Sequence, residues 1–280
     1  MNGSCSIRCI GTGERLENFR GHLRAIADCC WSTDDKFVVT CSDDGLVLLW
    51  QASGATCLQA YRGHVSAVLC CCINALSTII ASGSIDETIR LWNVASGGCV
   101  AVIPAHADPV TGVQFARDGS FLVSSSYDGS CRLWDVHTCG CIRTLRRSGL
   151  SPITRLAFAP TSSSILLGTL DRRLLSSVSV FTSDVDELEY LDTTLHFAGC
   201  VGCSENCVFM VIGSRAGTCS AWESDANKNS FKEIKLMTRD NQESAELCET
   251  CLADCTADGI NIVLCDQKSI FLYKRRACPQ

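Results

Sequence analysis

A histidine, a hydroxyl residue and an aspartate recur together three times in the first half of the 280-residue sequence, each time 42 residues further along. These are the residue types of a catalytic triad, in which the histidine takes a proton from the hydroxyl and the carboxylate orients the histidine. A tryptophan follows each aspartate at a constant distance. The three sets are His22, Thr40, Asp44 and Trp50; His64, Ser82, Asp86 and Trp92; and His106, Ser124, Asp128 and Trp134.

Repetition argues against catalysis by these residues. An enzyme needs one nucleophile and one base, whereas one set in every repeat is expected of an element that builds the repeats themselves. The sequence also contains no glycine-rich phosphate loop, no His-Glu-x-x-His pair and no nucleophile elbow. We therefore predict that the chain is not an enzyme and that the three sets have a structural role.

Cysteines form a second pattern with chemical potential. Cys200 and Cys203 form a Cys-x-x-Cys pair, and Cys248 and Cys251 form another one 48 residues later. Thiolates at this spacing are zinc ligands in many proteins, where four donors surround the metal. Residues three apart on a strand point to opposite faces, however, which opposes a shared metal. We prefer packing of equivalent cysteines in two repeats, with a metal site as the alternative, and predict no cofactor.

Short strand-like runs connect the residues of each set. These runs are rich in β-branched and apolar residues and are bounded by Gly, Ser and Asp turns. Each period of 42 residues has room for about four strands, and no long helical pattern interrupts them. The runs are residues 37–40, 78–81 and 121–124 in the first position, and residues 47–50, 89–92 and 131–134 in the second.

These residues resemble the WD40 repeat. Gly-His at 63–64, Ser-Gly-Ser-Ile-Asp at 82–86 and Ile-Arg-Leu-Trp-Asn at 89–93 carry the resemblance most clearly. It is close over residues 12–145 and weaker afterwards. The resemblance implies an all-β WD40 β-propeller, in which each repeat forms a four-stranded blade. In this family, the histidine, hydroxyl, aspartate and tryptophan form a buried hydrogen-bond network that ties the strands of one blade together.

The repeats predict a single β-propeller domain over residues 1–280, with six recognisable repeats. Residues 1–20 look like the last part of a further blade. We prefer a seven-blade plan with this N-terminal half blade as an incomplete blade, and a closed six-bladed ring is the alternative. An incomplete blade leaves open strand edges that invite partners. The six repeats are approximately residues 21–62, 63–104, 105–147, 148–190, 191–235 and 236–280.

Within this family, the third repeat resembles most closely the WD-repeat scaffold subunit of MLL-type (COMPASS) histone methyltransferase complexes. The similar segments are residues 105–110, 117–120 and 124–129. That subunit is not an enzyme, and it holds an arginine of a partner or a histone tail in the central opening of its propeller. Aromatic rings stack on the guanidinium and small polar groups accept its hydrogen bonds, which suits this planar cation.

The resemblance implies five peptide-binding positions. Thr111 would be a polar wall, Tyr127 a rim residue and Phe197 a stacking ring. Ala27 stands where the family has a serine, and Leu69 stands at the position of the second ring. Since leucine cannot stack as a ring does, the arginine pocket is expected to be weakened or to accept another ligand.

Composition restricts the partners and the location. The net charge is −6, so a generally basic nucleic-acid-binding surface is not expected. The first ten residues lack the apolar run of a signal peptide, and no apolar stretch of about 18 residues could span a membrane. We predict a nuclear or cytoplasmic protein. Its 22 cysteines would then stay reduced, mostly as small buried hydrophobes.

The function that follows is a non-catalytic WD40 scaffold that binds peptide segments of partner proteins. The specific form of this prediction is an arginine-bearing peptide in a histone methyltransferase complex, with SET-domain methyltransferase subunits or a histone tail as partners. The alternative is a WD40 adaptor in a ubiquitin ligase, RNA-processing or trafficking complex, because one propeller fold hosts many functions.

Overall fold

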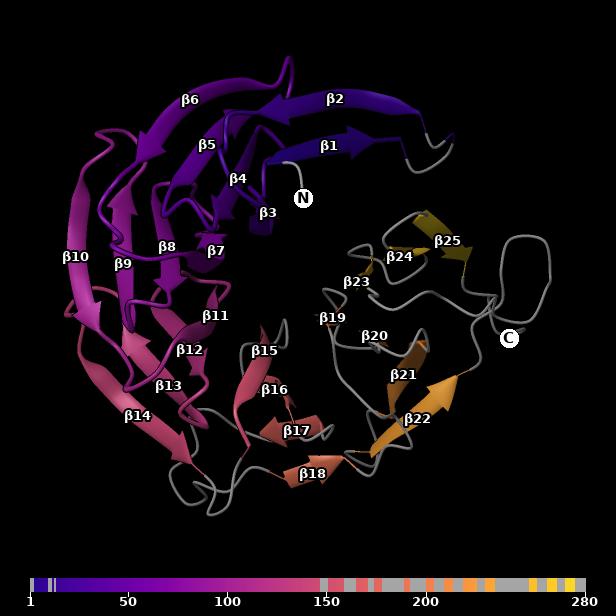
Figure 1. Ribbon diagram of the computed structural model, residues 1–280. Coiled ribbons are helices and arrows are strands. Elements are labelled where there is room, and N and C mark those ends of the chain that lie inside the picture. The colour runs from indigo at the N-terminus through magenta and orange to yellow at the C-terminus, as the bar shows by residue number, and fades with distance from the viewer. Residues whose placement is uncertain are drawn as a thin grey trace. The chain divides into compact units, whose positions relative to one another are not determined.

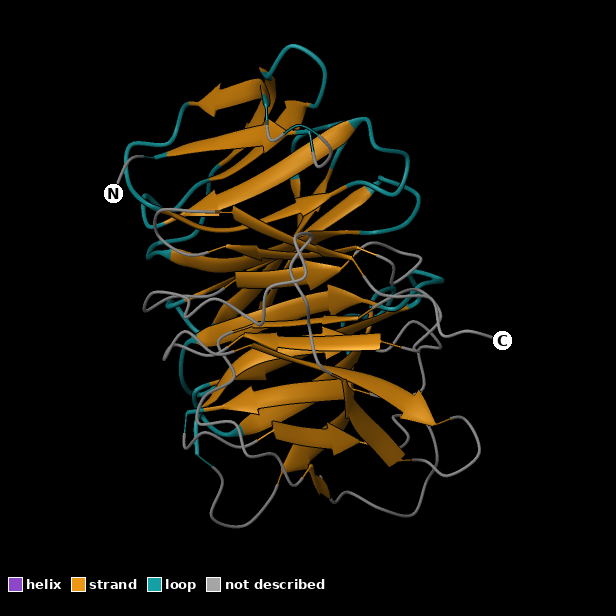
Figure 2. Cartoon of the chain, turned by 90° about the vertical axis from the view of Figure 1, so that its right-hand side faces the viewer, coloured by secondary structure: helices purple, strands orange, loops and turns teal. Residues whose placement is uncertain are grey.

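The computed structural model describes the backbone of residues 3–9, 12, 14–146, 151–158, 165–170, 174–177, 189–191, 200–203, 209–213, 219–225, 230–234, 252–255, 261–265 and 270–274. Side chains are described for those of these residues up to 157, and for residues 165 and 167–170. All regular secondary structure in the described part is antiparallel β-strand (Figures 1 and 2). No described segment is a helix long and apolar enough to cross a membrane.

The chain forms two compact units, Met1–Leu145 and Arg146–Gln280. In the first unit, a two-stranded sheet is followed by four-stranded sheets whose strands pair in sequence order. The two-stranded sheet is β1 (Ser4–Arg8) and β2 (Arg15–Arg20). The four-stranded sheets are β3 (Ile26–Trp31), β4 (Phe37–Ser42), β5 (Val47–Gln51) and β6 (Thr56–Tyr61); β7 (Val68–Ile73), β8 (Ile79–Ser84), β9 (Thr88–Asn93) and β10 (Cys99–Pro104); and β11 (Val110–Phe115), β12 (Phe121–Ser126), β13 (Ser130–Asp135) and β14 (Cys141–Arg146).

The second unit continues the same pattern. Its first two sheets have four described strands each, and its last sheet has three. These sheets are β15 (Ile153–Phe158), β16 (Ile165–Thr169), β17 (Leu174–Ser177) and β18 (Glu189–Leu191); β19 (Cys200–Cys203), β20 (Phe209–Gly213), β21 (Cys219–Asp225) and β22 (Ser230–Ile234); and β23 (Leu252–Cys255), β24 (Asn261–Cys265) and β25 (Ile270–Lys274).

The all-β fold class is confirmed, since successive antiparallel sheets of up to four strands are the blades of a β-propeller. Each predicted repeat contains one described sheet. The fourth strands of the first two repeats, β6 and β10, end just before the histidine of the next repeat. The extent of one domain over residues 1–280 and the choice between six and seven blades stay predictions.

The two N-terminal strands occupy the places of the third and fourth strands of a sheet. Cys5 of β1 lies opposite Phe19 of β2. In the next sheet, Val47 of β5 lies opposite Tyr61 of β6. Phe19 and Tyr61 each immediately precede the loop that carries the next histidine. The half blade expected over residues 1–20 is therefore present as β1 and β2.

Strand composition follows strand position. The second strands β4, β8 and β12 are buried on both faces after their first residue, which explains their unbroken runs of apolar and small residues. The fourth strands β6, β10 and β14 are mainly exposed at their beginnings. The apolar core lies between neighbouring sheets, because the first strand of one sheet packs on the first two strands of the sheet before it.

The cysteines that the structure describes form no disulfides. Only some of them are the buried hydrophobes that we expected. Burial holds for Cys41, Cys70, Cys71, Cys72 and Cys131. Exposed thiols are Cys29, Cys57, Cys99 and Cys141. Three of these exposed thiols lie on the fourth strands, where one edge of the sheet meets solvent.

This distribution predicts two classes of thiol reactivity. The freshly purified protein, unfolded without reductant, should give close to its full complement of 22 titratable thiols. In the native protein, Cys57, Cys99 and Cys141 should react with a thiol reagent before the buried Cys41 and Cys131, as mass spectrometry of the labelled peptides would report. A majority of thiols blocked in the unfolded protein would contradict the reduced state.

Candidate functional site

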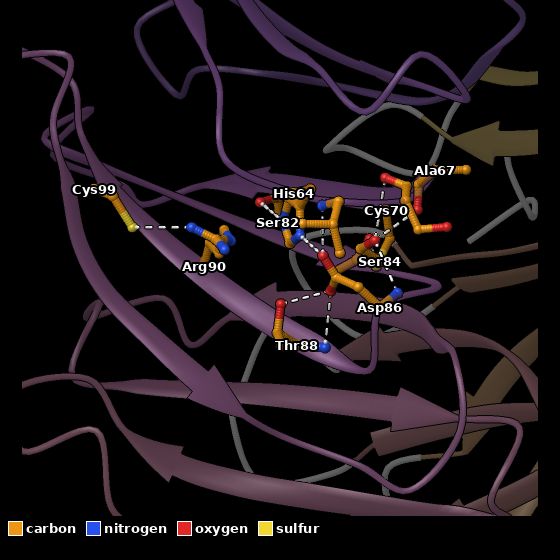
Figure 3. Close-up of polar contacts among 12 residues, drawn as sticks. His64, Ala67, Cys70, Ser82, Ser84, Asp86, Thr88, Arg90 and Cys99 are labelled. Carbon is orange, nitrogen blue, oxygen red and sulfur yellow. Dashed lines mark hydrogen bonds and ion pairs between the residues drawn. The ribbon is translucent and has the colours of Figure 1, made fainter.

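Each described histidine of the repeated sets bridges a carboxylate and a hydroxyl. In the second sheet, His64 Nδ1 lies 2.8 Å from an Asp86 carboxylate oxygen, and His64 Nε2 lies 2.8 Å from Ser82 Oγ (Figure 3). The indole N–H of Trp92 donates to the same Ser82 oxygen at 2.8 Å. Four side chains thus form one continuous chain of hydrogen bonds across the sheet.

The first and third sheets repeat this geometry. His22 lies 3.0 Å from Asp44 and 2.8 Å from Thr40 Oγ1. His106 lies 3.0 Å from Asp128 and 2.7 Å from Ser124 Oγ. Trp50 and Trp134 donate to the respective hydroxyl oxygens at 2.8 Å.

The aspartate joins the network to the backbone. Asp86 lies in the turn between β8 and β9, and its carboxylate accepts hydrogen bonds from the N–H groups of Val65 and Thr88, both at 3.1 Å. The Thr88 hydroxyl donates to it at 2.6 Å (Figure 3). Since Val65 lies in the loop before β7, Asp86 ties that loop to the turn between the second and third strands.

Proton positions follow from the burial of these groups. Burial raises the pKa of Asp86, but hydrogen bonds from Thr88 and His64 outweigh that effect and leave the pKa lowered. Burial also lowers the pKa of His64 by more than the neighbouring Asp86 raises it. A neutral His64 can donate from Nδ1 to the carboxylate and accept from the Ser82 hydroxyl at Nε2. Each of the four side chains in the network then has a hydrogen-bond partner.

Ser82 cannot act as a nucleophile in this arrangement. Its exposed fraction is 0%, its oxygen lies 2.8 Å from His64 Nε2, and the same oxygen accepts the indole N–H of Trp92. A substrate carbonyl has no approach to an oxygen that is buried and bonded on two sides. The triad-like spacing therefore produces a structural network in this fold.

Three predicted peptide-binding residues occupy equivalent positions in successive sheets. Ala27, Leu69 and Thr111 each fall where the pairing of the first and second strands shifts by one residue, so each is the extra residue of a β-bulge. A bulge changes the direction of the side chain that it carries. Thr111 is buried and its hydroxyl lies 3.1 Å from Ser125 Oγ, whereas Ala27 and Leu69 are half-buried.

Tyr127 lies beside the third bulge, in the turn between β12 and β13. Its N–H donates to the carbonyl of Pro109 at 3.2 Å, and its side chain is exposed. Asp43 and Ile85 have the equivalent bond to the residue two before the bulge in their own sheets. Each sheet therefore presents one turn side chain next to one bulge side chain.

A second row of exposed residues lies at this end of the sheets, and it was not predicted from the sequence. Leu23 and Val65 directly follow the histidines and are 88% and 87% exposed, and Ala107 is exposed at the same place in the third sheet. The signal was available, because these residues keep the interval of 42. We call the two exposed rows the loop-end surface, which consists of Leu23, Asp43, Val65, Ile85, Ala107 and Tyr127.

Other predicted site residues lie outside the described side chains. These are Phe197 and the four cysteines Cys200, Cys203, Cys248 and Cys251. The structure therefore leaves the role of Phe197 as a stacking ring and the metal alternative as predictions. Within the described part of the chain, no group of three or more histidine, cysteine or acidic residues is arranged to hold a metal ion.

Comparison with known proteins supports the WD40 repeat family for the first unit. The model of the WD domain, G-beta repeat, matches residues 13–51, 55–93 and 97–135. A WD40 repeat-containing protein smu1 from Dictyostelium discoideum is 44% identical over 41 residues, which are 15% of this chain and 8% of that protein. Each of these three segments thus matches one WD40 repeat. The finer resemblance to a COMPASS scaffold subunit stays a prediction.

Removal of one histidine should destabilise the fold. His64→Ala leaves Ser82 and Asp86 without their partner, and each buried polar group left unsatisfied costs about 1–3 kcal/mol. We expect urea denaturation to show a free energy of unfolding that is lower by a few kcal/mol. Val65→Ala, on the exposed neighbour, is the matched control and should change it by less than about 0.5 kcal/mol. Equal stability of the two variants would contradict the structural role.

Acid should also destabilise the first unit. The pKa of Asp86 is lowered in the folded protein, so its stabilisation is present above the ordinary pKa and is lost as the pH falls through the folded value. The lowered pKa of His64 makes its protonation, below about pH 6.5, favour unfolding. Urea denaturation should therefore show a falling free energy of unfolding from about pH 7 to pH 3. Asp86→Asn should flatten the acidic part of this profile, and Asp43→Asn, in the turn between β4 and β5 of the first sheet, is the control. An unchanged profile in Asp86→Asn would refute this account.

Proposed function

We propose that the chain is a non-catalytic WD40 scaffold whose loop-end surface binds peptide segments of partner proteins. The observation that carries the proposal is the exposure of Leu23 and Val65 on loops fixed by buried networks. Their own N–H groups donate to Asp44 and Asp86, so their backbone is held while their side chains face solvent. An apolar surface on a rigid support binds with little loss of conformational entropy.

The third sheet favours an arginine-bearing peptide as the ligand. Tyr127 offers an exposed aromatic face, and a guanidinium stacks on such a ring more readily than an ammonium does. Thr111 supplies a hydroxyl at the adjacent bulge, where it is paired with Ser125. Asp108 lies exposed in the loop before β11 and adds a negative charge beside them. A SET-domain methyltransferase subunit or a histone tail would present such an arginine.

At the bulge position, the first two sheets are apolar where the third sheet has the hydroxyl of Thr111, and at the turn position the first sheet carries Asp43. Leu69 and Ala27 carry no hydrogen-bonding group at the bulges, and Ile85 takes the place of Tyr127 in the second sheet. A ligand that crosses all three sheets would need apolar side chains next to its arginine. The proposed ligand is therefore an extended segment with one arginine flanked by apolar residues.

Calorimetric titration tests this proposal. The probe is a blocked peptide with one arginine between leucine and valine, compared with the same peptide carrying alanine for arginine. We expect the arginine peptide to bind the full chain, and Tyr127→Ala to weaken it by roughly fivefold or more, in line with about 1 kcal/mol for a cation–π contact. Tyr127→Phe should retain binding, since the ring remains.

Val102→Ala, on an exposed side chain of β10, is the control for a general effect of apolar surface. Equal binding of both peptides, or equal loss in Val102→Ala and Tyr127→Ala, would overturn the arginine form of the proposal. Absence of binding by either peptide would overturn the loop-end surface as their site.

A further inference from the structure

Two cysteines meet between the two-stranded sheet and the first four-stranded sheet. Cys5 lies on β1 and Cys29 lies on β3, and their thiols are hydrogen-bonded to each other. The two strands belong to different sheets, because β1 pairs with β2 and β3 pairs with β4. A bond between the two sulfurs would therefore connect two sheets that are hydrogen-bonded separately.

Strand pairing places both side chains at the same interface. Cys29 lies opposite Thr40, and Thr40 lies opposite Leu48. Paired residues of neighbouring strands project to the same face of a sheet, so Cys29 and Leu48 share a face. Cys5 packs against the core cluster that contains Leu48 and Val38. The hydrogen bond between the thiols thus belongs to a packed interface between two sheets.

The same two positions come together at the next two interfaces of the first unit. Val47 of β5 and Cys71 of β7, each 42 residues further along, share one core cluster. Ile89 and Val113, another 42 residues on, share the next cluster. The repeated fold therefore brings these positions into one core cluster each time. Among these three described interfaces, cysteine occupies both positions at the first alone.

A close backbone approach also holds β1 beside the chain that leads into β3. A Cβ added to Gly3 would lie 2.5 Å from the carbonyl oxygens of His22 and Arg24, so a larger residue would force the two segments apart. These oxygens belong to the loop between β2 and β3. The position of Cys5 relative to β3 is thus set by backbone packing as well as by the thiol contact.

The hydrogen bond makes the two thiols chemically different. Donation from Cys29 lowers the pKa of the Cys5 thiol to about 7, which outweighs the opposing effect of burial. The same hydrogen bond, together with burial, raises the pKa of Cys29. Near neutral pH, Cys5 is therefore the nucleophile and Cys29 remains protonated beside it. A thiol of low pKa with a second thiol next to it is typical of cysteines that react with peroxides.

We propose that Cys5 and Cys29 are a redox-active pair that closes to a disulfide when it reacts with a hydroperoxide. The Cys5 thiolate attacks one oxygen of hydrogen peroxide, the O–O bond breaks, and the departing hydroxide takes up a proton to give water. Cys5 is then a sulfenic acid. The Cys29 sulfur attacks the Cys5 sulfur, the S–O bond breaks, and the Cys29 proton leaves with the hydroxide as a second water. The thiols lose two electrons in total, and these reduce the peroxide.

The disulfide fastens β1 to β3 by a covalent bond. It closes the loop of residues 5–29, and it restricts the separation of the two sheets because β1 is also paired with β2. A reductant reverses the change by restoring both thiols. The pair includes no residue of the loop-end surface, so this inference goes beyond the proposed peptide-binding function.

The test is oxidation of the full, reduced chain by hydrogen peroxide near neutral pH, followed by alkylation of the remaining thiols and mass spectrometry of tryptic peptides. We expect a disulfide between the peptides of residues 1–8 and 25–36, which fragmentation assigns to Cys29 rather than Cys30. Cys57 is the control, because it is an exposed thiol whose pKa is raised by burial. Cys5 should be consumed about tenfold or more faster than Cys57, in line with its greater thiolate fraction.

Two variants separate the roles of the two cysteines. In Cys29→Ser, Cys5 should still react with peroxide but stop at the sulfenic acid, which dimedone traps. In Cys5→Ser, Cys29 should be oxidised about tenfold or more slowly than Cys5 is in the unaltered protein, because the thiol of low pKa is gone. Tyr127→Ala should leave the oxidation of both cysteines unchanged, which separates the pair from the fate of the proposed function.

A second measurement on the unaltered protein reports the effect on the fold. Amide hydrogen exchange of β1 should slow about fivefold or more on oxidation, and dithiothreitol should restore the original rate. Equal rates of oxidation of Cys5 and Cys57 would overturn the proposal. So would the lack of a disulfide, a disulfide that joins Cys5 or Cys29 to any other thiol, or unchanged exchange of β1 in the oxidised protein.

Discussion

A buried hydroxyl oxygen, hydrogen-bonded on two sides, holds each of the three WD40 repeats together. In the second repeat this is Ser82 Oγ, which accepts a hydrogen bond from the indole N–H of Trp92 and lies 2.8 Å from His64 Nε2. The histidine is also hydrogen-bonded to Asp86, and the Asp86 carboxylate accepts hydrogen bonds from the backbone N–H groups of Val65 and Thr88. Because a polar group buried without a partner is costly, the loss of one member disturbs the others. The loops at this end of the sheet are consequently fixed by the interior.

The hydrogen bonds that hold the loop backbone do not involve the exposed side chains of the loop-end surface. The residue after each histidine is bound through its backbone, so its side chain is free to differ between repeats without loss of the support. Leu23, Val65 and Ala107 differ in this way while their N–H groups all donate to the repeat aspartate. The β-bulges add a second variable position, where Leu69 and Thr111 provide an apolar and a polar group. One repeated framework can thus present a surface whose chemistry changes from sheet to sheet.

Sequence reasoning reached the fold and the networks because both depend on local period. The interval that places His64, Ser82 and Asp86 in register is readable without any tertiary structure, as is the alternation of strands and turns. The bulges at Ala27 and Leu69 were not readable, since a one-residue shift in pairing depends on how two strands meet. The prediction that most cysteines are buried was wrong for Cys57, Cys99 and Cys141. These cysteines lie on fourth strands at the outer side of the sheets, and the position of a strand in its sheet also depends on tertiary structure.

The most direct test of the account is a double-mutant cycle on the shared hydroxyl, with Ser82→Ala, Trp92→Phe and the double variant compared by urea denaturation. Trp92→Phe removes the indole N–H and keeps an aromatic ring. If Ser82 and Trp92 belong to one buried network, the two changes should be non-additive, with a coupling free energy of about 0.5–3 kcal/mol. Additive effects within the error of the measurement would show that the two side chains stabilise the repeat independently, and would contradict the account.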